Sequence, residues 1–184
     1  MRYVSTRGEA PVLSFSDALL AGLARDGGLY VPEAWPTLSR DEIAALAGKP
    51  YAAVAKAVIG PFVADALPPR ALDLMIDDAY AGFRHPAVAP LTQIGANRFI
   101  LELFHGPTLA FKDVALQLLG RMLEEILTRS GKRARIIGAT SGDTGSAAIE
   151  AVRDSRRVDI FMLHPRGRTS EVQRRQMTTV LSPN

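Results

Sequence analysis

The fold is decided by a stretch in which a strand, a glycine-rich turn and the start of a helix follow one another: Arg135-Ile136-Ile137-Gly138-Ala139-Thr140-Ser141-Gly142-Asp143-Thr144-Gly145-Ser146. Residues 135–138 predict a strand and residues 146–152 a helix. An apolar run at 158–163 predicts the next strand, and the Ser170/Gln173 capping-box pattern predicts a helix over 169–180. Strands that alternate with helices are typical of a parallel sheet with helices on its faces.

The same alternation extends upstream of this stretch. Residues 98–104 predict a strand, which we expect to be a third member of the parallel sheet, and apolar residues recur at helical spacing over 114–130. Three such strands make about half of a doubly wound sheet, so the fold class is α/β with an incomplete parallel sheet. We expect residues 96–184 to be the first, truncated part of a larger α/β domain.

The sequence before residue 95 has a different pattern. It predicts extended pieces at 3–6 and 29–32, and a helix over 17–23 that Ser16 caps. Three more helices are predicted over 39–47, 50–59 and 69–83, the first opened by a Ser39/Glu42 capping box. Residues 1–95 are therefore predicted to be a small, mainly helical N-terminal domain, with Trp35 in its core.

Composition excludes several classes of protein. Of 184 residues, 47% are hydrophobic and 22% charged, which is typical of a folded globular chain, and no apolar run is long enough for a membrane span. Zero cysteines exclude disulfides and thiolate metal sites, and no secretory signal follows Met1, so we expect a cytoplasmic protein. Seven arginines gather between Arg153 and Arg175, but no aromatic side chains alternate with them for base stacking, so no nucleic-acid partner is expected.

The first candidate site is a lysine segment between a strand and a helix, Leu103-Phe104-His105-Gly106-Pro107-Thr108-Leu109-Ala110-Phe111-Lys112-Asp113. Ligand sites of open α/β sheets form at such positions. Apolar neighbours disfavour the charged form of Lys112, and an uncharged amine is a nucleophile that can form an imine with an aldehyde such as pyridoxal phosphate. The alternative is a solvated lysine in the first helical turn. Asp113 is interpreted as a helix cap or as an anion that compensates the helix dipole, and His105 as a structural histidine rather than a base.

The second candidate site is the turn from Thr140 to Thr144. Backbone donors at the start of a helix bind anions, and the hydroxyl groups of Ser141 and Thr144 add further donors. The guest could be a carboxylate or a phosphate, and the alternative is an ordinary helix cap with turn glycines. No Gly-Lys-Ser/Thr follows, which excludes a P-loop, and no metal-ligand spacing occurs, so no metal is expected.

These two motifs resemble the threonine synthase family, in its longer bacterial and fungal type. The segment from His105 to Asp113 is similar to that family's cofactor-lysine motif almost residue for residue, and Thr140-Ser141-Gly142-Asp143-Thr144-Gly145 is similar to its loop for the amino-acid carboxylate. The resemblance also includes residues 3–8, 26–32 and 164–167, and so extends over essentially the whole chain. It implies a fold of the tryptophan-synthase-β type that binds pyridoxal 5'-phosphate.

The resemblance also implies an activity and residue roles. Such an enzyme converts O-phospho-L-homoserine and water to L-threonine and phosphate. Lys112 would hold the cofactor and shuttle protons, Phe111 would pack beside it and Asp143 would approach its 3' oxygen. Thr140, Ser141, Gly142, Asp143 and Thr144 would surround the substrate carboxylate.

One departure from the family pattern limits the expected activity. Family members are longer, and their loop for the cofactor phosphate and their group for the pyridine nitrogen come later in the chain, so we expect this chain alone to be inactive. Two alternatives stay open. One is a related lyase of the threonine dehydratase or cysteine synthase type, and the other is a non-catalytic anion-binding module.

Overall fold

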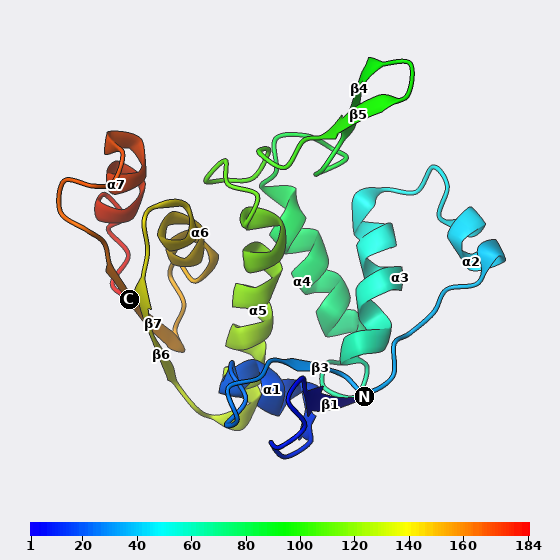
Figure 1. Ribbon diagram of the computed structural model, residues 1–184, viewed down its shortest axis with the longest axis horizontal. Helices are drawn as coiled ribbons and strands as arrows, with labels where there is room; N and C mark the ends of the chain where they lie inside the picture. The colour runs from blue at the N-terminus through cyan, green and yellow to red at the C-terminus, as the bar shows by residue number, and fades with distance from the viewer. The chain divides into compact units, whose positions relative to one another are not determined.

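The computed structural model describes residues 1–184 and divides them into two compact units, Met1–Asp77 and Asp78–Asn184. Figure 1 shows the elements of both units along the chain. The domain boundary near residue 95 stays a prediction from the sequence.

The first unit begins with a small antiparallel sheet. Strand β1 (Arg2–Ser5) lies between β2 (Leu13–Ser14) and β3 (Tyr30–Pro32). Helix α1 (Phe15–Ala21) follows β2 without a linker, and the side chain of Ser14 accepts a hydrogen bond from the Asp17 amide. The prediction that Ser16 caps this helix was therefore wrong, because the last residue of β2 is already extended and takes the N-cap position.

Three further helices complete the first unit. Helix α2 (Arg40–Ala45) starts with the predicted capping box between Ser39 and Glu42. Helix α3 (Tyr51–Val63) runs past the predicted end at residue 59 and contains Pro61, and helix α4 (Pro69–Ala81) begins at a proline. Proline near the end of a helix removes one backbone donor. Burial of Val63, which is 1% exposed, offsets that loss.

In the second unit, the first two strands form a hairpin. Strands β4 (Leu91–Gly95) and β5 (Arg98–Leu101) are antiparallel and pair with each other (Figure 1). The expectation that residues 98–104 form a third parallel strand was wrong. The short turn at Ala96 and Asn97 lets residues 91–95 satisfy the backbone groups of β5 locally, and the sequence pattern had predicted no strand over 91–95.

The parallel sheet consists of β6 (Ala134–Ala139) and β7 (Val158–Leu163), paired in register from Ala134 with Val158 to Ala139 with Leu163. Helices α5 (Asp113–Ser130), α6 (Asp143–Ala151) and α7 (Glu171–Thr178) accompany it. Helix α6 starts at Asp143, three residues before the predicted start, because the turn glycines bring the first helical residue forward. None of the helices of the chain has the length and apolarity that crossing a membrane requires.

The two faces of this sheet differ in burial. On one face, Val158 and Ile160 pack with Leu127 of α5 and Val152 at the end of α6. On the other face, Ile137, Phe161 and Leu163 are more than half exposed. Side chains alternate between the faces of a strand, which explains the difference in burial. Because β6 and β7 are parallel, the turns that follow them lie at the same edge of the sheet.

Candidate active site

Lys112 lies at the start of helix α5 and is the last residue of the lysine loop, which we define as residues 105–112. It occupies the N-cap position in helical conformation, and its Nζ lies 4.2 Å from the centroid of the Phe111 ring. By contrast, the Lys56 ammonium pairs with the Asp77 carboxylate at 2.9 Å. An ammonium that meets an aromatic face instead of a carboxylate keeps its nitrogen accessible to a ligand.

A buried carboxylate fixes the lysine loop from within. Asp113 is 0% exposed, and its two oxygens accept hydrogen bonds from the amide (2.8 Å) and the hydroxyl group (2.7 Å) of Thr108. Gly106 lies so close that a Cβ there would come within 2.4 Å of the Asp113 Cβ. Asp113 therefore folds the loop back onto α5, and the interpretation of this residue as a simple helix cap was wrong.

The lysine loop also contains a strained residue. Leu109 has a φ of 65°, which lies in the left-handed region that residues other than glycine rarely adopt. Its amide donates a hydrogen bond to the Gly106 carbonyl group. Such a conformation costs about 1–3 kcal/mol and persists where the surroundings enforce it. Here the Thr108–Asp113 hydrogen bonds enforce it, three residues before Lys112.

The second loop, residues 138–146, is organised by the hydroxyl group of Thr140. Its Oγ1 accepts hydrogen bonds from the amides of Gly142 (3.0 Å) and Gly145 (3.1 Å). The N-cap residue Gly142 provides no side-chain cap to α6. The first amides of a helix have no acceptor within it, so the amides of Asp143 and Thr144 are available to an anion.

One cavity joins the two loops. It measures about 460 Å³ and is lined by Leu103, Phe111, Lys112, Val114, Ala115, Leu116 and Thr144. The structure thus brings Lys112, Phe111 and Thr144 together. Thr140 turns inward to the backbone of its own loop, Ser141 is exposed, and the Asp143 carboxylate accepts a hydrogen bond from Gln173 of α7 at 2.6 Å.

His105 has a protein partner. Its Nε2 lies 2.7 Å from Oε2 of Glu102, and the other Glu102 oxygen accepts from the Thr92 hydroxyl group. Hydrogen bonds from Thr92 and then from His105 lower the pKa of Glu102. This geometry agrees with a structural role for His105, and no group of three His, Cys, Asp or Glu side chains forms that could hold a metal ion.

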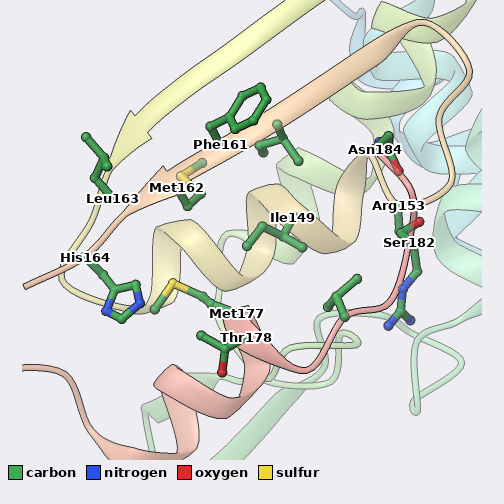
Figure 2. A pocket seen from close by; sticks show the side chains of 12 residues that line it. Ile149, Arg153, Phe161, Met162, Leu163, His164, Met177, Thr178, Ser182 and Asn184 are labelled. Atoms are coloured by element: carbon green, nitrogen blue, oxygen red, sulfur yellow. The ribbon is translucent and has the colours of Figure 1, made fainter. Parts of the chain in front are cut away.

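A second cavity of about 380 Å³ lies between β7, α6 and α7 (Figure 2). Met177 of α7 and Ile149 of α6 both line it, and His164 follows the end of β7. The His164 Nδ1 is buried and has no hydrogen-bond partner. This cavity contains none of the residues that the sequence predicts for the site.

Sequence reasoning missed three residues that shape the site. Asp113 was noticed but given the wrong role, and Gln173 was noticed for its capping pattern alone. Gln176, whose Nε2 donates to the Thr108 carbonyl group at 3.0 Å, was not noticed. The spacing of Gln173 and Gln176 on one helical face was a visible signal, but their partners lie 30 and 68 residues away.

Comparisons with known proteins find similarity to threonine synthases. The family described as "Threonine synthase N terminus" matches residues 2–80. Threonine synthase of Pseudomonas aeruginosa is 58% identical over all of this chain and 39% of its own length. The crystal structure of PLP-bound threonine synthase from Brucella melitensis matches with a TM-score of 0.93 at 61% identity, over 96% of this chain and 38% of that one.

A more distant solved structure gives the same result. Threonine synthase from yeast matches with a TM-score of 0.92 at 40% identity, over 98% of this chain and 38% of that chain. The chain thus spans about two fifths of the length of the relatives it matches. In sequence and in fold, this chain is similar to threonine synthases over nearly all of its own length and over about two fifths of theirs.

Proposed function

We propose that the protein containing this chain uses pyridoxal 5'-phosphate to convert O-phospho-L-homoserine and water into L-threonine and phosphate. One observation carries the proposal: Lys112 and Thr144, which are 32 residues apart and belong to different loops, line the same cavity. A reactive amine beside an anion-binding helix start suits a cofactor aldehyde and an amino-acid substrate together.

The chemistry of the cavity fits the cofactor's aldehyde and ring. Lys112 supplies the only amine among the lining residues, and Phe111 supplies a flat apolar surface beside it. Leu103, Val114 and Leu116 make the rest of the wall largely apolar. An aromatic aldehyde is accommodated by these groups, with the amine placed to bond to it covalently.

Each residue then has a stated task. The cofactor, when bound, supplies an electron sink that stabilises negative charge on the substrate carbons. Lys112 Nζ holds the cofactor and afterwards removes and returns protons at the substrate carbons. The Thr144 hydroxyl group and the free amides at the start of α6 bind the substrate carboxylate, which fixes the α-carbon near Lys112. Phe111 would pack beside the bound cofactor, and Asp143 would lie toward its 3' oxygen.

The remaining parts of the proposal concern partners and location. The substrate is a small phosphorylated amino acid, and neither nucleic acid nor membrane is a partner. Three of the seven arginines near the C-terminal end form ion pairs: Arg153 with Glu150, and Arg174 and Arg175 with Glu171. We place the protein in the cytoplasm, which the absence of cysteines supports.

The test is phosphate release from O-phospho-L-homoserine by the full-length protein with added pyridoxal phosphate. We expect stoichiometric threonine and phosphate, and at least about a 1000-fold loss in Lys112→Ala. Lys132→Ala, which changes an exposed lysine, is the matched control. Deamination of threonine or serine without phosphate release would favour the dehydratase alternative, and no turnover of any of these compounds would favour the binding module.

A further inference from the structure

Helix α7 contacts both loops of the candidate site through two glutamines. Gln176 Nε2 donates to the Thr108 carbonyl group in the lysine loop at 3.0 Å, and Gln173 Nε2 donates to Asp143 Oδ1 at 2.6 Å. The two glutamines are three residues apart, so they lie on one face of α7. A single helical face is thus bonded to both loops.

The contact between α7 and the second loop is close. A Cβ on Gly142 would come within 2.4 Å of the Gln173 side chain, and a Cβ on Gly145 within 2.7 Å of the Met177 sulfur. Met177 is 8% exposed and points from α7 toward α6 (Figure 2). The glycines of this loop therefore make room for α7 as well as for a ligand.

The orientation of the Gln173 amide is fixed. Its Oε1 accepts a hydrogen bond from the Ser170 hydroxyl group at 2.9 Å, while its Nε2 donates to Asp143. Ser170 is also the N-cap of α7. With Oδ1 engaged in this way, Asp143 keeps its other oxygen for a ligand.

We propose that Gln173 and Gln176 are positioning residues, through which α7 sets the Asp143 carboxylate and the lysine loop in their working arrangement. This inference rests on the proposed function and deepens it. Gln173 acts on the second loop through Asp143, and Gln176 acts on the lysine loop through the Thr108 carbonyl group. Neither glutamine lines the cavity, so neither is a catalytic residue.

The first test uses the cofactor-free full-length protein and measures backbone amide hydrogen exchange. We expect Gln176→Leu to speed exchange about 5- to 10-fold in residues 106–112, and Gln173→Leu to do so in residues 140–146, as the loss of one hydrogen bond implies. Gln93→Leu, the same substitution on β4, is the control and should change neither loop. Exchange that stays at the wild-type rate in both loops overturns the proposal.

The second test uses the loaded full-length enzyme and a donor–acceptor exchange. Gln173→Glu puts a second carboxylate against Asp143, so we expect kcat to fall about 10-fold or more, with KM changed less, and the pH midpoint of the bound cofactor's absorbance to move. In Gln173→Glu/Asp143→Asn the donor and acceptor are exchanged, and kcat should recover by at least about 3-fold over Gln173→Glu. The role of Gln173 is overturned if kcat does not recover in the double variant, or if Gln173→Glu has the same kcat as the wild-type enzyme.

The two proposals fail in different ways. If the wild-type full-length protein releases no phosphate from O-phospho-L-homoserine, the proposed function fails, whatever the exchange rates show. If the wild-type protein is active and the glutamine variants match Gln93→Leu, the positioning role alone fails.

Discussion

The lysine loop and the second loop hold ligand-facing groups at one cavity, but they are fixed by different means. The lysine loop folds around a fully buried charge, Asp113, and carries a strained residue, Leu109. The second loop folds around a neutral hydroxyl group, that of Thr140, and uses glycines where the backbone needs room.

This difference indicates which of the two loops is more rigid. A loop that holds the amine of Lys112 must keep one nitrogen atom in place. The buried carboxylate with its two hydrogen bonds does this, because breaking those hydrogen bonds is energetically costly. A loop that binds an anion through backbone amides depends on the N-terminus of the following helix, and a rigid loop interior is less important for it. The lysine loop is therefore expected to be the stiffer of the two.

The largest expected effect is on stability. Asp113→Ala leaves the Thr108 amide and hydroxyl group without their charged acceptor, and should lower the free energy of unfolding by about 3 kcal/mol. Thr140→Val, which removes a neutral acceptor from the second loop, should cost about 1–2 kcal/mol. Urea denaturation of both variants measures the two values. If Thr140→Val proved the more damaging, the comparison of the loops would be reversed.

The next effect is on substrate affinity. Thr144→Val removes a hydroxyl group from the cavity without changing side-chain size, and a hydrogen bond to a charged group is worth about 1.5–3 kcal/mol. We expect substrate binding by the full-length protein to weaken roughly 10- to 100-fold, with cofactor binding retained. A variant that loses the cofactor and binds the amino acid normally would show that the loop has a different guest.

A smaller effect concerns the strain at Leu109. Glycine adopts a φ of 65° without penalty but is more flexible when unfolded, so Leu109→Gly should change the free energy of unfolding by less than about 1 kcal/mol. Hydrogen exchange in the lysine loop is the measurement, and it should stay within a few-fold of wild type because Asp113 still fixes the loop. A large acceleration there would mean that the Leu109 side chain, and not Asp113, holds the loop.

The smallest effect is a pH dependence in α7. Hydrogen bonds from Arg174 and then Arg175 lower the pKa of Glu171 from 4.5 to about 2. The stabilisation from this carboxylate is therefore complete above about pH 4.5 and is lost as the pH falls toward 2. The stability difference between wild type and Glu171→Gln should shrink over that range. A difference that is constant from pH 7 to pH 2 would rule out this ion pair as its source.

Much of the fold could be predicted from local pattern. The capping box at Ser39 and Glu42 and the strand at 158–163 follow from short-range rules, and both are present as predicted. The hairpin at 91–101 could not be predicted in this way, since pairing of strands depends on a partner and not on a segment's own composition. Trp35, expected in the core, is 67% exposed and packs edge-on against Phe62.

The candidate site shows the same division. Lys112 and Thr144 were identified by their position between a strand and a helix, and both line one cavity. The reasoning was only partly right, because β5 before the lysine loop pairs with β4 and is not a member of the parallel sheet. The role of Asp113 could not be predicted, because no sequence pattern indicates that its carboxylate accepts hydrogen bonds from Thr108. The Gln176 contact spans 68 residues, which no local rule covers.

The central claim is that Lys112 is the residue that binds the cofactor, and one measurement tests it most directly. The full-length protein is mixed with pyridoxal phosphate, reduced with borohydride to fix the cofactor to its lysine, and the modified peptide is identified by mass spectrometry. We predict that the label lies on Lys112, and that Lys112→Ala loses both the label and the visible absorbance of the bound cofactor while Lys132→Ala keeps both. A label on another lysine, or absorbance that survives in Lys112→Ala, would contradict the account.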